Sequence, residues 1–598
     1  MEEKESLNKR MWFAMASACA AMIAFAVGVA HAGGPRTATP IEHVIVVVGE
    51  NHTFDNVFGV YQPTKGQSVF NLLSEGIVNA DGTPGPNFSN AAQYEATDTT
   101  VTPGSYSPTP PRGSAYANLA RPDTTYAYGL TNNVPDPRWP VVLPNGPFQL
   151  TKHGNVNAGA AYFGGITGDP VHRFFQMWQD YDGGRNDLFY FVGLTIGTGS
   201  NGVTPPFDTH QGAVAMGFDN MSAGDEPVFK YLADHYAISD NYHQAVMGGT
   251  GANFIFLGTA DFGYFTDSSG NAAIPPSNQI ENPNPVAGYN NWYTNDGYGG
   301  ASVNYAGSYV NCADSSQPGV KPILDYLNSL SYKPKPNCEP GHYYLVNNYN
   351  PAYNADGSSA GYPPPGGTSN VYRLPPQVRM TIADELSAAG ISWKYYIGGE
   401  NGGNPTESWC SICNPFQFTK SIMETSKRNN IVDVPQFYKD LKSGNLPSVI
   451  FIRPYETYAG HPADSTQSFY ENFITTLVSA VKRNDKTWDK TAILVTEDEG
   501  GGYYDSGYIQ PVDFFGDGTR IPLIVVSPYA KEGYVDHTYY DHGSVLKFIE
   551  ANWGLGTLTG RSRDNLPNPV QAAGSYVPTN SPAIGDLMNM FDFSHHWH

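Results

Sequence analysis

Two short runs of apolar residues, far apart in the chain, limit the folds that this sequence can adopt. The first, Val44–Val48, consists of four valines and one isoleucine, and the second spans Thr491–Thr496. Continuous runs of this length, without alternation, are typical of strands buried on both faces in a parallel sheet. Such strands are covered by helices above and below, so the two runs point to an α/β fold.

Polar side chains follow each run. Glu50 and Asn51 come after the first, and Glu497, Asp498 and Glu499 come after the second, before three consecutive glycines. Because ligands of open α/β sheets bind at the carboxyl ends of the strands, we expect these side chains at one edge. Carboxylate and amide oxygens suit hard divalent cations, so we predict one shared cation site. The alternative is that each acid caps a following helix or turn.

Further strands and helices alternate along the rest of the chain. The expected strands are 391–396, 449–452 and 521–526, and the expected helices are 169–179, 227–234, 378–389, 468–482 and 543–552. The first helix is expected to have Asp169 as its N-cap and Pro170 as its first residue. The alternation predicts a three-layer α/β/α fold with a mostly parallel central sheet.

One hydroxyl residue stands out among glycines. Thr250 lies between Gly249 and Gly251 and precedes the apolar helical run 254–257. A threonine at a helix amino terminus lies among free backbone N–H groups, where an oxyanion or phosphate is stabilised. From the spacing alone, an ordinary N-cap explains Thr250 equally well.

Composition predicts long loops around a smaller regular core. The 598 residues include 64 glycines, 47 prolines and 40 tyrosines. Two stretches without sustained periodicity, about 62–157 and 264–373, are predicted to be insertions into one domain spanning 33–598. The net charge of −22 disfavours nucleic acid as a partner.

The amino terminus is typical of an export signal. Lys9 and Arg10 precede the apolar stretch 11–30, and Ala30-His31-Ala32 forms an A-x-A cleavage site. We therefore expect residues 1–32 to be removed and the protein to be periplasmic or secreted. The alternative is an uncleaved anchor, since about 20 apolar residues can span a bilayer. No other stretch is long and apolar enough to do so.

Four cysteines remain after the signal. They are Cys312, Cys338, Cys410 and Cys413. In an oxidising compartment they allow two disulfides in three connectivities, of which we favour Cys312–Cys338 with Cys410–Cys413. The C-x-x-C pair could instead be redox-active or half of a zinc site, although no second C-x-x-C exists.

Several blocks between about Ile41 and Trp553 carry a family resemblance. Residues 50–59 read E-N-H-T-F-D-N-V-F-G, a long and specific motif. The other blocks are Asp498-Glu499-Gly500-Gly501, Thr250 with Asn253 three residues on, His172 in a D-P-x-H pattern, His461-Pro462, and Tyr540-Asp541-His542-Gly543-Ser544. With these the chain resembles the bacterial phosphoesterase family of non-haemolytic phospholipase C and acid phosphatase A, whose fold is similar to that of alkaline phosphatase and the arylsulfatases.

The resemblance implies a set of site residues. It implies one divalent metal ion, calcium, magnesium, manganese or zinc, on Glu50, Asn51, Asp498 and Glu499. It implies Thr250 as the nucleophile, which would form a covalent phosphothreonine. His461 is the candidate general acid for the leaving group, His172 would bind a phosphoryl oxygen, and Asn253 would help to bind substrate. A protonated histidine in these roles favours a mildly acidic optimum.

The sequence departs from the acid phosphatase pattern at one place. Those members carry a paired histidine before a Pro-Phe, whereas here Cys410–Asn414 precedes Pro415. This departure concerns the acid phosphatase specificity and leaves the phosphoesterase assignment intact. The expected substrate is a small phosphate ester or a phospholipid headgroup, as in an acid phosphatase or a phospholipase C. The alternative is a non-catalytic extracellular binding protein that retains the metal site, with carbohydrate stacking on its tyrosine-rich loops.

Overall fold

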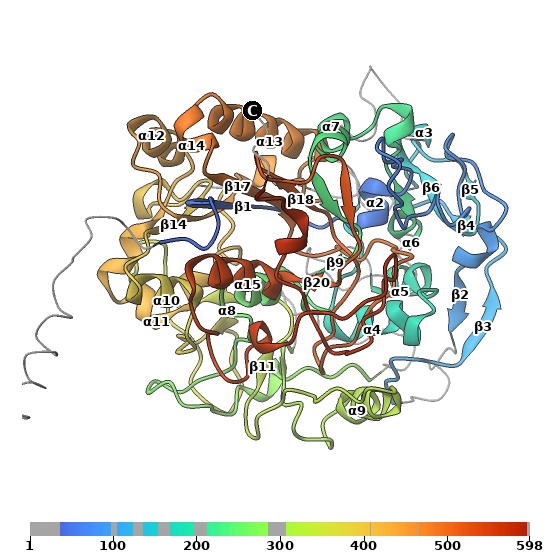
Figure 1. The fold of residues 1–598 in the computed structure, drawn as a ribbon. Coiled ribbons are helices and arrows are strands. Elements are labelled where there is room, and N and C mark those ends of the chain that lie inside the picture. The colour runs from blue at the N-terminus through green and yellow to red at the C-terminus, as the bar shows by residue number, and fades with distance from the viewer. Residues whose placement is uncertain are drawn as a thin grey trace, which may run out of the picture. The chain divides into compact units, whose positions relative to one another are not determined.

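An eight-stranded sheet forms the centre of the computed structural model (Figure 1). The structure describes residues 36–96, 105–122, 135–153, 168–196, 212–284, 307–406, 408–462 and 464–594. The predicted signal peptide, 1–32, lies outside them. In spatial order the strands are β15 (Ile431–Val432), β14 (Trp393–Ile397), β16 (Val449–Arg453), β1 (His43–Gly49), β17 (Thr491–Glu497), β18 (Leu523–Val526), β8 (Ala237–Ser239) and β19 (Tyr534–Asp536).

Strand β1 lies in the middle of the sheet. It runs parallel to β16 on one side and to β17 on the other, and Val44–Val48 are at most 1% exposed. The predicted burial of this run on both faces is therefore confirmed. Gly49 is in register with Glu497 at the last paired position. The chain leaves both strands at the same edge, where Glu50 and Asp498 follow.

The sheet is mostly parallel, as predicted, with one exception. Strand β18 runs antiparallel to both of its neighbours, β17 and β8. The other neighbouring pairs of the described sheet, including β8 with β19, are parallel. The apolar run at 521–526 predicted this strand but carried no information on its direction.

Helices cover both faces of the sheet and complete the three layers (Figure 1). One face carries α7 (Pro227–His235), α12 (Pro435–Ser443), α13 (Gln467–Lys482) and α14 (Asp485–Trp488), and the other carries α8 (Thr250–Thr259), α10 (Ile382–Ala388), α11 (Lys420–Met423) and α15 (His542–Trp553). Successive side chains of β14 show the alternation, because Tyr395 packs on Phe416 beside α11, whereas Tyr396 packs on Phe437 of α12.

Two helices begin later than the sequence predicted. Helix α4 is Phe174–Tyr181, so the expected start at Asp169 is wrong. The preceding residues are extended, and the Phe174 N–H is bound by Asn347 Oδ1 at 2.9 Å from another segment. Helix α10 begins at Ile382 instead of 378, because Thr381 and Asp384 form a capping box there. In both cases a specific polar contact sets the helix start.

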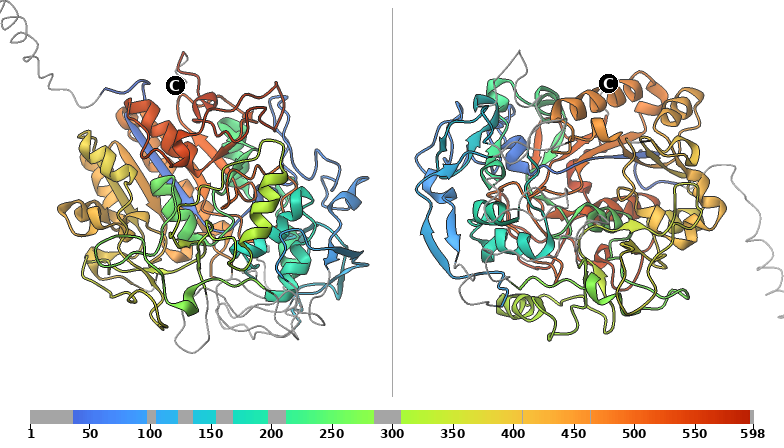
Figure 2. Two further views of the ribbon diagram at one scale, coloured as in Figure 1. Left: turned by 90° about the horizontal axis from the view of Figure 1, so that it is seen from below. Right: turned by 180° about the vertical axis from the view of Figure 1, so that it is seen from behind.

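The loop-rich segments pack around the sheet. Segment 62–157 contributes the short strands β2 (Tyr94–Ala96), β3 (Arg112–Ala115), β4 (Leu119–Ala120), β5 (Val142–Leu143) and β6 (Phe148–Gln149), which lie together on one side (Figure 2). They bury a second apolar cluster that includes Trp139, Phe148 and Tyr190. Whether this segment is an insertion into a single domain stays a prediction.

The predicted cysteine pairing is confirmed. Cys312 bonds Cys338, and Cys410 bonds Cys413. A search of the helices in the described ranges finds none with the length and apolar character needed to cross a membrane.

Candidate metal and phosphoester site

Four polar residues meet where β1 and β17 end. Glu50, Asn51, Asp498 and Glu499 are each at most 1% exposed. Asp498 Oδ1 accepts hydrogen bonds from the backbone N–H groups of Asn51 at 3.3 Å and Glu499 at 2.8 Å. The parallel register of the two strands thus brings together residues that lie 447 positions apart.

The backbone around this group is closely packed. Asn51 has a φ of 71°, in the left-handed region, and Gly501 follows the acidic pair with a φ of 59°. A Cβ atom on Gly501 would lie 2.6 Å from the Cβ of Asn51. Glycine at 501 is therefore needed both for its conformation and for the close approach of Asn51.

Three side-chain oxygens in this group fit a cation. Asn51 Oδ1, Asp498 Oδ2 and Glu499 Oε2 are buried and have no hydrogen-bond partner among the described residues. Buried polar atoms are almost always paired, and orphaned carboxylate and amide oxygens are the ligands of hard divalent cations. The residues present thus suit the divalent ion that the sequence implied.

The charges of the group support the same fit. Burial raises the pKa of Asp498 and of Glu499 well above the usual range, and each is raised further by a neighbouring carboxylate, Glu50 and Asp498 respectively. Burial also raises the pKa of Glu50, with Arg453 opposing. Several carboxyl groups thus share a site from which water is excluded, and they require either protons or a cation.

Thr250 points its hydroxyl into this group. It is the first residue of α8, after Gly249 as N-cap, and its Oγ1 donates a hydrogen bond to Glu499 Oε1 at 3.1 Å. The hydroxyl does not cap the helix, so the N-cap explanation does not hold. Thr250 therefore combines a helix amino terminus with a carboxylate partner.

Asn253 lies one helical turn below Thr250 and holds the preceding loop. Its Nδ2 donates to the carbonyls of Val246 at 3.1 Å and Gly248 at 2.9 Å, and its Oδ1 accepts from the Val246 N–H at 3.0 Å. Both polar atoms are thus occupied by backbone, so Asn253 positions the loop before Thr250. The part in substrate binding that the resemblance implied for Asn253 stays a prediction.

His172 lies beside Glu499 on the segment before α4. Its Nε2 is 3.8 Å from Glu499 Oε1, and its Nδ1 is 2.7 Å from the Pro170 carbonyl. Burial lowers the pKa of His172, although Asp169 opposes this effect. In the neutral ring Nδ1 carries the proton, and Nε2 faces the site as an acceptor.

His461 approaches from the loop between β16 and α13. Its Nε2 is 3.0 Å from Asn51 Nδ2, and its Nδ1 is 2.6 Å from the Pro462 carbonyl. Burial lowers the pKa of His461, but the carboxylates of Asp169, Glu50, Asp464 and Glu456 outweigh it and raise the pKa to about 10. His461 is therefore the histidine of this site that is most ready to hold a second proton.

The sequence did not assign two neighbours of Glu50. Arg453, the last residue of β16, is fully buried and places Nη2 2.8 Å from Glu50 Oε1 and 2.6 Å from Glu456 Oε2. Cys413 Sγ lies 2.8 Å from the same Glu50 oxygen. The available signals were the strand end at Arg453 and the replacement of the family's histidine block by C-x-x-C.

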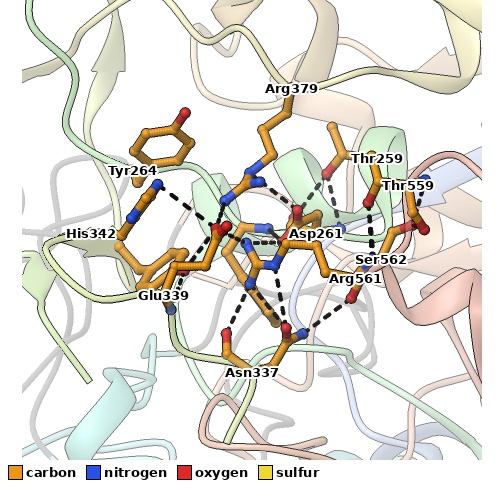
Figure 3. A network of polar contacts seen from close by, with 12 residues as sticks. Thr259, Asp261, Tyr264, Asn337, Glu339, His342, Arg379, Thr559, Arg561 and Ser562 are labelled. Carbon is orange, nitrogen blue, oxygen red and sulfur yellow. Dashed lines mark hydrogen bonds and ion pairs between the residues drawn. The ribbon is translucent and has the colours of Figure 1, made fainter. Parts of the chain in front are cut away.

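A network of ion pairs anchors the far end of α8 (Figure 3). Asp261, just after the helix, is paired with Arg379 and Arg561 at 3.1 Å each, and Arg561 also reaches Glu339 at 2.9 Å. His342 lies in this network, with Nε2 3.7 Å from Glu339 Oε2. The network connects the helix of Thr250 to the loop that follows Cys338.

Comparison with known proteins gives a family match over most of the chain. The model of the Phosphoesterase family matches residues 41–556. Among curated relatives, "Non-hemolytic phospholipase C" of Burkholderia pseudomallei is 27% identical over 309 residues, 43% of this chain and 41% of the relative. "Phospholipase C B" of Mycobacterium tuberculosis is 22% identical over 635 residues, covering 99% of this chain and 86% of the relative.

Other matches are more partial. "Acid phosphatase" of Aspergillus niger is 30% identical over 200 residues, 31% of this chain and 44% of the relative. A solved structure of a protein in the alkaline phosphatase superfamily from Vibrio parahaemolyticus aligns with a TM-score of 0.24 and 12% identity, covering 56% of this chain and 61% of that one. The chain thus spans less than half of two of these relatives and most of the mycobacterial one.

Proposed function

The chain belongs to the Phosphoesterase family, and from this premise we propose that it hydrolyses phosphoric ester bonds with Thr250 as the nucleophile. One observation carries the proposal. The buried Thr250 hydroxyl donates to Glu499 inside a group of acids and an amide, three of whose oxygens have no partner among the described residues. A binding protein would have no need for a nucleophile in that position.

The proposed metal ligands are Glu50, Asn51, Asp498 and Glu499. The orphaned oxygens of Asn51, Asp498 and Glu499 fit calcium, magnesium or manganese, with zinc less suited to oxygen ligands alone. When bound, a divalent cation there supplies positive charge that activates the nucleophile and offsets charge on the phosphoryl group. Arg453, the last residue of β16, pairs with the Glu50 carboxylate and holds it in place.

In the first step, Thr250 Oγ attacks phosphorus in line with the leaving group. The bond between phosphorus and the leaving oxygen breaks, and a phosphothreonine forms. Glu499 Oε1 accepts the hydrogen bond of the Thr250 hydroxyl, so it is placed to take that proton. The amino terminus of α8 stabilises the negative charge of the phosphoryl oxygens.

We assign protonation of the leaving oxygen to His461. A protonated ring donates through Nε2, and the leaving oxygen takes the place of the Asn51 amide as the partner of this nitrogen. In the second step a water molecule gives a proton to His461 and attacks phosphorus. The bond from phosphorus to Thr250 Oγ breaks, and Glu499 returns to Oγ the proton that it took in the first step. The products are the alcohol and inorganic phosphate or a phosphorylated headgroup.

His172 is assigned to a phosphoryl oxygen. Its Nε2 faces Glu499 and can donate only when the ring is protonated. Because burial lowers the pKa of His172, this form is populated below the usual value of 6.5. This role favours turnover under mildly acidic conditions.

The substrate class is a small phosphate ester or the headgroup of a phospholipid. Relatives named as phospholipase C and as acid phosphatase support both. The expected export agrees with two disulfides in the described chain. With an acidic net charge of −22, nucleic acid is not among the expected partners.

The test is a pair of assays on the protein without residues 1–32. p-Nitrophenyl phosphate reports a monoesterase and p-nitrophenyl phosphorylcholine a phospholipase-C-like enzyme, each with wild type and Thr250→Ala, before and after chelation. We expect turnover of at least one, loss on chelation, recovery with a divalent ion, and no turnover by the variant. If wild type cleaves neither ester with any ion added back, the proposal fails and the extracellular binding protein remains.

A further inference from the structure

The two glycines beside Thr250 face one side chain. A Cβ atom on Gly249 would lie 2.6 Å from Oδ1 and 3.0 Å from Nδ2 of Asn348, and a Cβ atom on Gly251 would lie 3.4 Å from the same Oδ1. Gly249 has a φ of −74°, which other residues also adopt, so glycine is needed at 249 for the space that Asn348 occupies. The amide of Asn348 therefore lies directly against the backbone that carries Thr250.

Asn348 reaches this position from a segment 97 residues after Gly251. The segment follows β11 (Tyr344–Leu345), which pairs with β10 (Tyr309–Val310). A Cβ atom on Gly248 would collide with the carbonyl oxygen of Val346, so the segment packs closely on the loop before α8. Asn348 itself is 3% exposed. Close packing thus holds its side chain at the amino terminus of the helix.

One hydrogen bond fixes the orientation of the Asn348 amide. Its Oδ1 accepts the Gly251 N–H at 2.7 Å, so the other branch of the amide must be the NH₂ group. This Nδ2 has no hydrogen-bond partner among the described residues. Amide groups buried this deeply are normally paired at both ends. Asn348 thus holds a donor beside Thr250 for which the described chain supplies no acceptor.

The start of α8 offers one more donor. The Gly251 N–H is occupied by Asn348 and does not remain for a ligand. The N–H groups of the next two residues both point to the Gly249 carbonyl, at 3.1 and 3.2 Å. The Thr250 N–H forms no hydrogen bond within the described ranges. The donors that remain at the nucleophile are therefore the Thr250 N–H and Asn348 Nδ2.

We propose that Asn348 binds a non-bridging phosphoryl oxygen through Nδ2, together with the Thr250 N–H. This assignment rests on the proposed function and adds a substrate-binding residue to it. When Thr250 attacks, negative charge is spread over the non-bridging oxygens of the phosphoryl group. Donors that are already fixed in position stabilise this charge without reorganisation. The glycines on both sides of Thr250 make room for such a donor.

The experiment compares four proteins on the p-nitrophenyl ester that wild type cleaves. They are wild type, Asn348→Asp, Asn348→Ala and the control Asn311→Asp. The aspartate keeps an oxygen for the Gly251 N–H and replaces only the donor, whereas the alanine introduces no buried charge and keeps the test open if the aspartate variant fails to fold. Asn311 is 7% exposed, and its Oδ1 also accepts one backbone N–H, that of Ala313 at 3.2 Å, at the other end of the β10–β11 pair.

We expect kcat/KM of both Asn348 variants to fall by about 10²–10³-fold, the loss that follows removal of one such donor in other hydrolases. Asn311→Asp should stay close to wild type. If wild type cleaves neither ester, the proposed function itself fails. If wild type is active and both Asn348 variants keep its activity, only the assignment of Asn348 is overturned.

Binding of inorganic phosphate separates substrate contact from a purely structural role. It is measured by calorimetry on Thr250→Ala and on the double variant Thr250→Ala/Asn348→Ala. Because neither protein has the nucleophile, a residue that only positions the Thr250 hydroxyl would have no effect here. We expect the dissociation constant of phosphate to rise about tenfold or more in the double variant, since a hydrogen bond to a charged group is lost. Equal dissociation constants would overturn the proposal.

Discussion

The side-chain amide nitrogen of Asn51 lies 3.0 Å from His461 Nε2, and this contact couples the proposed metal site to the proposed general acid. With Nδ2 toward the ring, Asn51 leaves its Oδ1 free for a cation, and the ring nitrogen must accept. If the His461 ring were protonated, its Nε2–H would point at the Asn51 amide group, which is also a donor. The amide orientation that suits a metal therefore opposes protonation of His461, whereas the carboxylates around the ring favour it.

Asn51→Asp changes this coupling in a defined direction. The variant keeps an oxygen ligand but places a carboxylate oxygen beside Nε2, which favours the protonated ring. The pKa of His461 should rise, so the loss of activity at high pH should move to a higher pH by about one unit or more. The measurement is kcat/KM against pH on the better of the two chromogenic esters. An unmoved basic limb would exclude His461 as the acid.

Thr250→Ala removes the proposed nucleophile. We expect a loss in kcat of about 10⁴-fold or more, since loss of a hydroxyl nucleophile in other hydrolases has effects of this order. Thr250→Ser keeps a hydroxyl in the same hydrogen bond to Glu499 and serves as the matched control, with activity within roughly tenfold of wild type. Equal, small losses in both variants would show that Thr250 has only a structural role.

Arg453→Met should strongly destabilise the fold. The variant leaves the buried carboxylate of Glu50 without its ion-pair partner, and breaking a buried pair costs about 3–5 kcal/mol. Urea unfolding of the metal-free protein measures the effect. The control is Lys490→Met, whose pair with Glu42 has side chains 48% and 52% exposed and should contribute about 1 kcal/mol or less. Similar losses of stability in both variants would contradict the role of Arg453 as the partner that stabilises the buried Glu50 carboxylate.

The buried acids Asp219, Asp225, Glu226 and Glu471 predict an unusual pH dependence of stability. Burial raises the pKa of Glu471 to about 7, and burial together with neighbouring acids raises those of Asp219 and Glu226 well above their usual range. The folded state therefore binds more protons than the unfolded state. Stability in chelator should be present below about pH 4.5 and fall as pH rises through 7.

The Glu226→Gln variant isolates this effect from other titrating groups. Its free energy of unfolding, measured with urea in chelator from pH 5 to pH 8, should fall less steeply than that of wild type. If the free energy of unfolding in chelator falls with pH equally steeply in both proteins, Glu226 does not have the raised pKa that is assigned to it.

The part of the site that the sequence predicted is the part set by strand periodicity. Glu50, Asn51, Asp498 and Glu499 meet because two buried parallel strands end in register, and the apolar runs alone contain that information. The placement of Thr250 beside Glu499 agreed with the glycine-rich turn before α8. At these residues the local sequence pattern was enough to predict where the side chains lie in the folded protein.

The remaining contacts depend on which distant strands and loops meet at the sheet edge. Arg453 and Cys413 reach Glu50 through packing that no local pattern encodes, and the start of α4 depends on Asn347 in a distant segment. The direction of β18 was likewise not encoded in its run of apolar residues. Such features follow from the three-dimensional arrangement, which periodicity does not describe.

The register of β1 with β17 also has a consequence for synthesis on the ribosome. Asn51 and Asp498 lie 447 residues apart, so at about 5–20 residues per second the second half of the site emerges roughly 20–90 s after the first. For most of that interval, until β16 is made, the nascent chain carries the apolar segment Val44–Val48 without either neighbouring strand. A strand from the centre of the finished sheet thus needs protection during most of translation.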